Sequence, residues 1–161
     1  MVFQSEGNNF TITGFTIGAG AGKDVLDLRD IVTDMGGLSN PNGGTGIVDY
    51  ANTASNITGT VVTLSAFPAA DSAATIAALF SFAVGGGGTV NTYVGADSKM
   101  LFIAPSDSDA GSKIWSWNDT NAGGGDADGV VDAGELTLHG TLMGIDENDY
   151  GTLHSDNIIL T

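Results

Sequence analysis

The chain has no cysteine and very few basic residues, and each absence removes a class of function. Without cysteine among its 161 residues, it has no disulfide, no thiolate metal site and no cysteine nucleophile. Four lysines and arginines stand against 19 aspartates and glutamates, giving a formal net charge of −15. We therefore exclude nucleic acid as a partner, because phosphate binding requires clustered basic side chains. A surface of this charge attracts cations instead.

Long apolar runs and a leader sequence are also missing. The longest apolar stretch, residues 73–84, is interrupted by Thr75 and Ser81, and a transmembrane helix needs about 20 apolar residues. The first five residues lack the basic and apolar regions of a signal peptide. We therefore expect no transmembrane segment. If the protein is exported, we expect its address to lie upstream or at the C-terminus.

What is present is typical of one β-rich domain spanning residues 1–161. The length fits a single domain, and 42% hydrophobic residues are enough for a core. The 25 glycines fall in clusters, which suits tight turns between short strands. We predict a mostly β, β-sandwich-like fold. The patterns of apolar residues predict strands near residues 10–17, 47–50, 54–65, 90–94, 100–103, 112–117, 136–142 and 157–160.

One short helix is predicted at about residues 71–84. Asp71 or Ser72 provides its N-cap, and the following alanines favour helix. The glycine run at 85–88 ends it. Residues 23–34 fit either a turn of helix or an edge strand, and their pattern does not decide between the two.

The most informative segment is an acidic, glycine-rich loop that begins at Asp119 and ends at Glu135. It matches the EF-hand calcium loop, in which alternate carboxylates share one direction, a glycine reverses the chain and a glutamate closes the shell. Calcium takes six to eight oxygen ligands, so this spacing predicts a calcium site. The matching residues, in loop order, are Asp126, Asp128, Gly129, Val130 (through its carbonyl), Asp132 and Glu135.

The first loop position departs from the EF-hand pattern. It falls on Gly124, which has no side chain, so we predict that glycines 123–125 are an insertion and that Asp119 or Asn121 reaches back as the first ligand. The flanking segments have strand patterns, so the loop joins strands rather than helices. The alternative is a solvated Asp/Gly turn, which would crowd carboxylates without a counter-ion. Magnesium fits less well, because it keeps several waters.

Other acidic clusters have weaker spacing. The aspartates between residues 24 and 34 recur with a period near three, which fits either a second ion site or one solvated helix face. Asp107 and Asp109 have the pattern of a turn. The members of the first cluster are Asp24, Asp27, Asp30 and Asp34.

No pattern of residues indicates an enzyme. The two histidines, His139 and His154, are not spaced as metal ligands, and we expect His139 to be exposed or hydrogen-bonded in a strand. No nucleophile elbow, P-loop or dinucleotide fingerprint is present. Trp115 and Trp117 would share one face of a strand. We expect core packing beside the loop rather than sugar stacking for this pair.

Both ends of the chain resemble a known bacterial module. Several segments are similar to the C-terminal module of proteins exported by type I secretion. They are Trp115–Asp119, Gly129–Leu138, Gly140–Ile145 and Leu153–Leu160, with Val2–Phe3, Ile12–Gly18 and Asp24–Leu28 at the front. Those proteins often carry repeats-in-toxin calcium arrays, and one subset is known as bluetail-domain proteins. The middle of the chain, about residues 36–90, carries no such motif, and the glycine-rich nonapeptide repeats are absent.

The resemblance implies a secreted, non-enzymatic protein that folds outside the cell, where calcium is abundant. It also implies recognition by the type I secretion machinery through an uncleaved C-terminal signal. An ion that binds only the folded state would couple folding to export. The alternative is a self-assembling surface protein, such as a filament, S-layer or biofilm-matrix subunit, in which calcium stabilises contacts between copies of the chain.

Overall fold

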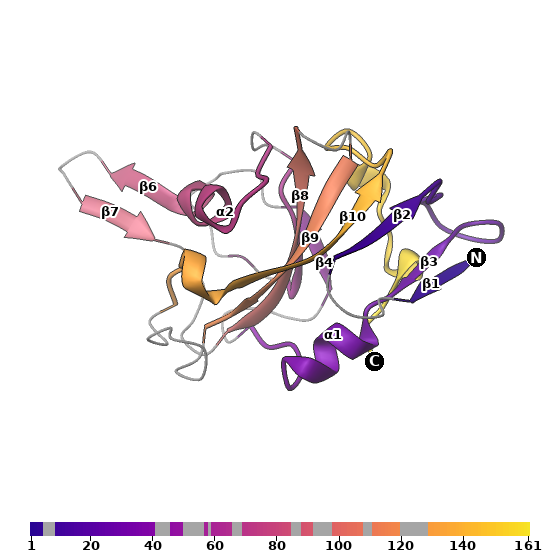
Figure 1. Cartoon of the computed structure of the whole chain (residues 1–161), viewed down its shortest axis with the longest axis horizontal. Helices are drawn as coiled ribbons and strands as arrows, with labels where there is room; N and C mark the ends of the chain where they lie inside the picture. The colour runs from indigo at the N-terminus through magenta and orange to yellow at the C-terminus, as the bar shows by residue number, and fades with distance from the viewer. Residues whose placement is uncertain are drawn as a thin grey trace.

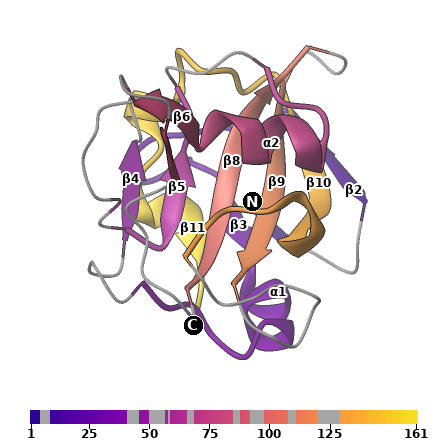
Figure 2. The ribbon, with the colours of Figure 1, turned by 90° about the vertical axis from the view of Figure 1, so that its left-hand side faces the viewer.

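The computed structural model describes residues 1–4, 9–40, 46–49, 57, 59–65, 69–84, 88–91, 98–107, 111–119 and 129–161. This part of the chain is mostly β. A mixed six-stranded sheet forms the centre, a three-stranded sheet lies on one side of it, and helix α2 crosses the other side (Figures 1 and 2).

The central sheet combines antiparallel and parallel pairing. Its strand order is β2-β10-β9-β8-β5-β4, with antiparallel pairs in the middle and parallel pairs toward both edges. The three long strands are β8 (Lys99–Ser106), β9 (Gly111–Asn118) and β10 (Leu136–Met143). The short ones are β2 (Phe10–Thr13), β4 (Ile47–Asp49) and β5 (Val61–Thr63).

Strand β10 is irregular where it meets both neighbours. Its pairing with β9 shifts between Leu138 and Gly140, so His139 lies at a bulge. On the other side, Gly140 pairs with Phe10 of β2. A Cβ on Gly140 would lie 2.5 Å from the Phe10 ring, so this close approach requires glycine.

Both faces of the central sheet are buried, which explains why β8 and β9 are buried almost throughout. On one face, Phe102 and Trp117 belong to a core that α2 covers. On the other face, Leu101 and Ile114 belong to a core shared with the three-stranded sheet. That sheet has the parallel order β1-β3-β11, with β1 Val2–Gln4, β3 Val25–Asp27 and β11 Ile158–Ile159.

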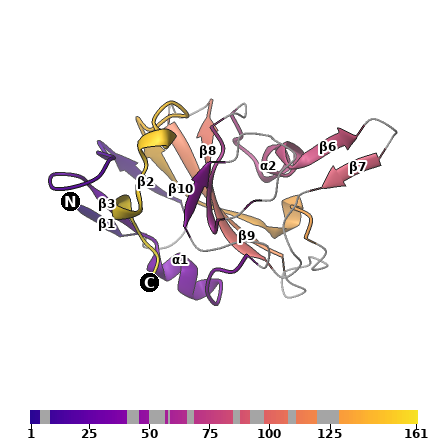
Figure 3. The ribbon, with the colours of Figure 1, turned by 180° about the vertical axis from the view of Figure 1, so that it is seen from behind.

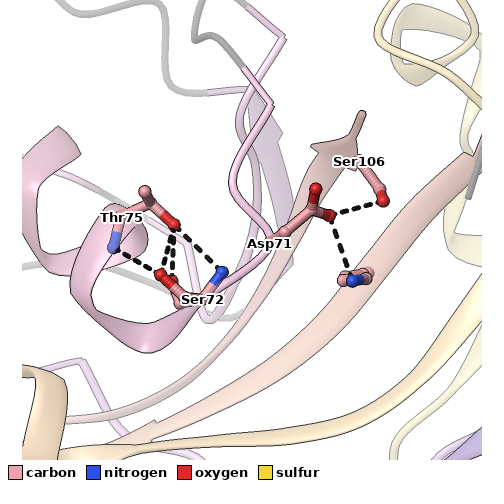
Figure 4. A network of polar contacts seen from close by, with 5 residues as sticks. Asp71, Ser72, Thr75 and Ser106 are labelled. Atoms are coloured by element: carbon pink, nitrogen blue, oxygen red, sulfur yellow. Dashed lines mark hydrogen bonds and ion pairs between the residues drawn. The ribbon is translucent and has the colours of Figure 1, made fainter. Parts of the chain in front are cut away.

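Helix α2 (Ala73–Leu79) begins with a capping box. The Ser72 hydroxyl accepts from the Thr75 N–H at 3.2 Å, and the Thr75 hydroxyl accepts from the Ser72 N–H at 3.0 Å. The preceding Asp71 accepts from the Ser106 hydroxyl of β8 and pairs with Lys113 Nζ of β9 at 3.0 Å (Figure 4). These contacts fix the start of α2 on the sheet.

The predicted helix at 71–84 is only half right. Its first part is α2, but residues 81–84 form strand β6 (Ser81–Val84), which pairs with β7 (Gly88–Asn91). Pairing with β7 satisfies backbone groups between the two strands, and this hairpin overrides the helix preference of the individual residues. The resulting hairpin projects from the body of the molecule (Figures 1 and 3).

The prediction of a single helix is also wrong, because residues 23–34 contain both of the structures that were considered for them. Residues Val25–Asp27 form β3, and Arg29–Asp34 form a second helix, α1, which buries Ile31 and Val32. Lys99 Nζ donates to the Met35 carbonyl at the end of α1 at 2.7 Å.

Three short 3-10 turns complete the described part: η1 (Ala133–Glu135), η2 (Tyr150–Thr152) and η3 (Ser155–Asn157). Neither helix of this part is long or apolar enough to cross a membrane. The predicted strand segments at 54–56 and 92–94 lie outside the described residues.

Candidate metal centre

The predicted calcium loop leaves the sheet at the end of β9 and returns to it at the start of β10. Asp119 directly follows β9, and η1 directly precedes β10. These strands are antiparallel neighbours in which Leu136 pairs with Trp117. The two ends of the loop are therefore brought together by the sheet.

The described ends of the loop are firmly anchored. Asp119 is fully buried, and its N–H donates to the Ser98 carbonyl at 2.9 Å. Its Oδ2 accepts from the Gly129 N–H at 2.8 Å. Gly129 has φ +79°, which agrees with its predicted place at the sharp turn. Val131 then enters the core beneath α2.

Glu135 is the central residue of this site. Its side chain is only 6% exposed. Its Oε2 accepts from Trp117 Nε1 at 2.9 Å and from the Asp132 N–H at 3.3 Å. Its Oε1 is buried and has no hydrogen-bond partner among the described residues. Burial raises the pKa of Glu135, the two hydrogen bonds oppose this, and the charges of Asp119 and Asp132 raise the pKa further.

No basic side chain of the protein neutralises Glu135. The chain has four lysines and arginines, and the structure describes all of them. Arg29 pairs with Asp27 at 2.6 Å and Lys113 with Asp71. Lys99 donates to a backbone carbonyl at the end of α1, and Lys23 packs against Gly18. A buried carboxylate without a cation is unfavourable, so a cation from solution would be stabilising here.

The predicted ligands divide into two groups. Asp119, Val130, Asp132 and Glu135 are described and lie at the two joined ends of the loop. The other three, Asn121, Asp126 and Asp128, lie outside the described residues. Within the part that the structure describes, no three Asp, Glu, His or Cys side chains form a ready metal-binding group. A complete shell would need backbone, amide or water oxygens, or the remaining loop residues.

A polar hollow of about 260 Å³ opens beside Glu135, between α1 and the sheet. Asn118 and Thr137 lie beside Glu135 along this hollow, and Asn118 Oδ1 is buried without a hydrogen-bond partner. The sequence alone did not identify Asn118 or the bond from Trp117, although both flank the loop. The polar side chains of the hollow are Asp34, Ser116, Asn118, Glu135, Thr137 and His139.

His139 is not exposed, and only one of its ring nitrogens is satisfied. The side chain is 8% exposed, and Nε2 is 2.8 Å from the Ser116 hydroxyl. Its Nδ1 is buried without a partner. Burial lowers the pKa of His139, and the charge of Asp34 opposes this shift, so the ring is neutral at pH 7.

Most of the other acidic candidates that the structure describes lie apart from this site, and Asp34 is the exception. Asp24 accepts from the N-terminal ammonium at 2.6 Å and from the Thr16 N–H at 2.9 Å, and these bonds lower its pKa. Asp27 pairs with Arg29. Asp30 lies in the first turn of α1, and Asp34 faces the hollow. Asp107 is exposed, and Asp109 lies outside the described residues.

No protein-family model, curated protein or solved structure matches this chain. Its function must therefore be inferred from the chemistry of its own residues.

Proposed function

We propose that the protein is a secreted, non-enzymatic calcium-binding module whose folding is coupled to calcium outside the cell. The ion is held where the loop meets the sheet, with Asp119, Asp132, Glu135 and the Val130 carbonyl as the described ligand candidates. The loop residues Asn121, Asp126 and Asp128 remain ligands predicted from the sequence spacing. We further infer that the two packed sheets form a β-sandwich-like scaffold for this site.

One observation carries the proposal: the carboxylate of Glu135 is buried, one oxygen has no partner, and no basic side chain pairs with it. Two further carboxylates, Asp119 and Asp132, are close enough to raise its pKa. Calcium is a hard cation that binds such oxygens in flexible geometry, and it would replace mutual repulsion with attraction.

The link to folding follows from the position of Glu135. Its Oε2 is held by Trp117, which is fully buried and stacks on Phe102 with ring centroids 6.1 Å apart. Phe102 in turn stacks on Phe80 at the end of α2. An ion on Glu135 is thus tied to the aromatic core, and this geometry exists only in the folded chain.

The extracellular setting rests on the resemblance to type I secretion substrates and on the acidic, cysteine-free composition. Calcium is scarce in the cytosol, so the module would remain weakly stable there and gain stability after export. At a calcium concentration 100 times Kd, binding adds about 2.7 kcal/mol to stability, a large share of a domain's total.

Thermal unfolding during a calcium titration tests the proposal. We compare wild type, Glu135→Gln and Glu147→Gln, because Glu147 is an exposed glutamate in a turn and its substitution makes the same change in charge. Wild type and Glu147→Gln should rise together by about 5–10 °C at 100 times Kd, and Glu135→Gln should stay flat. If the melting temperature of wild type does not change with calcium, calcium binding is refuted. If all three melting temperatures rise equally, this site is refuted.

The alternative function, self-assembly, is tested with the same samples. Met1 and Val2 are the large hydrophobic residues that the described surface exposes, so this part of the chain shows no broad apolar patch. Size-exclusion chromatography with calcium and with a chelator distinguishes the two functions. Monomers in both conditions support the folding module, whereas polymers that dissolve in chelator support calcium-linked assembly.

A further inference from the structure

We infer that the calcium ion lies at the end of the hollow beside α1, between Asn118 and Glu135, and that Asn118 supplies a ligand from outside the predicted loop. The inference rests on the proposed function and deepens it. It assigns the ion a position and a ligand that the spacing of the loop does not contain, since the first loop position of the EF-hand pattern falls on a glycine.

Two buried oxygens that have no hydrogen-bond partner in the described part of the chain carry the inference. They are Asn118 Oδ1 and Glu135 Oε1, and their residues both line the same hollow. The Glu135 side chain is more than nine-tenths buried. Buried polar atoms in folded proteins are nearly always satisfied, so two unpartnered acceptors on residues that line one hollow indicate a shared missing partner. That partner must be a cation or a donor of hydrogen bonds.

The chemistry of the hollow favours a hard cation as this partner. Its polar lining includes the carboxylates of Asp34 and Glu135 and no lysine or arginine. Amide and carboxylate oxygens are ordinary calcium ligands. Calcium also retains water, and a volume of about 260 Å³ leaves room for several molecules at about 30 Å³ each.

A third unpartnered atom, Nδ1 of the lining residue His139, fits the same arrangement without binding the ion. Imidazole nitrogen is a poor ligand for calcium, which prefers oxygen. A water on the ion, however, is a strong hydrogen-bond donor that His139 Nδ1 can accept from. The His139 ring is therefore a reporter for an ion in the hollow, and His154, more than half exposed, is an internal control.

Asn118 permits a clean test because its side-chain oxygen makes no hydrogen bond to the described residues. Replacing it by leucine removes an unpaired buried oxygen at nearly constant volume, so the calcium-free fold should be retained. Asn118→Asp keeps an oxygen at the same place and adds charge. Asn148→Leu, in an exposed turn, is the matched control.

The experiment measures terbium binding and its displacement by calcium. Terbium replaces calcium on oxygen ligands and emits when excited through a nearby indole, and Trp117 is hydrogen-bonded to Glu135. We expect Asn118→Leu to weaken calcium binding about ten- to hundredfold. Asn118→Asp should bind at least as tightly as wild type, and Asn148→Leu should be unchanged. In histidine NMR spectra, calcium should shift the His139 ring signals and leave those of His154 in place.

The outcomes separate this inference from the proposed function. If Glu135→Gln abolishes binding while Asn118→Leu binds like wild type, the ion belongs to the loop alone and the inference is overturned. A His139 ring that does not respond to saturating calcium has the same consequence. If wild type binds neither terbium nor calcium, both the proposed function and the inference are wrong.

Discussion

Two acidic side chains contact opposite ends of β9, and their surroundings differ in charge. Asp71, at the start of α2, contacts Lys113 near the beginning of β9 and the Ser106 hydroxyl of β8 (Figure 4). Glu135 contacts Trp117 near the end of β9 and receives only uncharged N–H donors. The Asp71 junction thus contains its own cation, whereas the Glu135 site does not.

The difference is informative because it cannot be attributed to burial alone. Asp71 retains 34% of its side-chain exposure and still has a lysine, while Glu135 is far more buried and has none. Desolvation should be worse for Glu135, and burial raises the pKa of this carboxyl group. All four basic residues of the chain lie away from Glu135. The Glu135 site therefore depends on a cation from solution.

The largest expected effect comes from neutralising Glu135. Glu135→Gln keeps the shape and an acceptor for Trp117 but removes the charge. In saturating calcium, the variant should lose the calcium-linked stability, about 2.7 kcal/mol at 100 times Kd. In chelator it should be more stable than wild type by about 1 kcal/mol, because an uncompensated buried charge is gone. Urea unfolding in both conditions measures this reversal of sign, and a variant that is less stable in both would contradict it.

Removing the lysine at the other end of β9 should lower the free energy of unfolding by a smaller amount, and this loss should not depend on calcium. Lys113→Met leaves Asp71 without its ion pair, and we expect a loss of about 2 kcal/mol, below the range for fully buried pairs because Asp71 is partly exposed. Lys23→Met is the control, since no carboxylate of the described residues pairs with Lys23. Equal losses for Lys113→Met in calcium and in chelator are expected, and a loss confined to chelator would mean that the two ends are not independent.

The central strands of the sheet could be predicted from the sequence, because the patterns that indicate them are local. Strong apolar patterns located β8, β9 and β10, and the pairing of Trp115 and Trp117 on one face correctly placed both in the core beside the loop. Gly129 was identified by the need for a reversal and has the expected positive φ. Each of these conclusions depends on a few neighbouring residues.

Most of the rest depends on contacts between distant parts of the chain. The parallel pairing of β2 with β10 joins Phe10 to Gly140, and no local pattern specifies it. The end of the predicted helix became β6 through a short-range contact, the hairpin pairing with β7, which the helix pattern of the sequence does not reveal. The hollow exists because α1 docks beside the ends of β9 and β10, so the role of Asn118 was not readable from its neighbours. The whole Asp71 network was likewise missed, although Asp71 was recognised as a candidate cap.

A smaller effect is expected from the helix that positions Asp71. Ser72→Ala removes the hydroxyl of the capping box, and loss of an N-cap costs about 1 kcal/mol. Since α2 also packs against η1, this variant tests whether destabilising the helix changes calcium binding at Glu135. We expect an equal loss with and without calcium and an unchanged calcium Kd by terbium displacement. Ser155→Ala, in an exposed 3-10 turn, is the control, and a weakened Kd for Ser72→Ala would show that α2 supports the ion site.

The smallest effect concerns pH and the neutral ring of His139. Burial lowers its pKa in the folded protein, so the unfolded chain binds the proton more readily. The stability that depends on the neutral ring is complete above the unfolded pKa of about 6.5 and is lost as pH falls below that value. In chelator, between about pH 7.5 and pH 5, wild type should lose more stability than His139→Gln, by less than about 1 kcal/mol. Identical slopes for wild type and His139→Gln would mean that water already reaches the ring, and that the hollow solvates its polar groups without an ion.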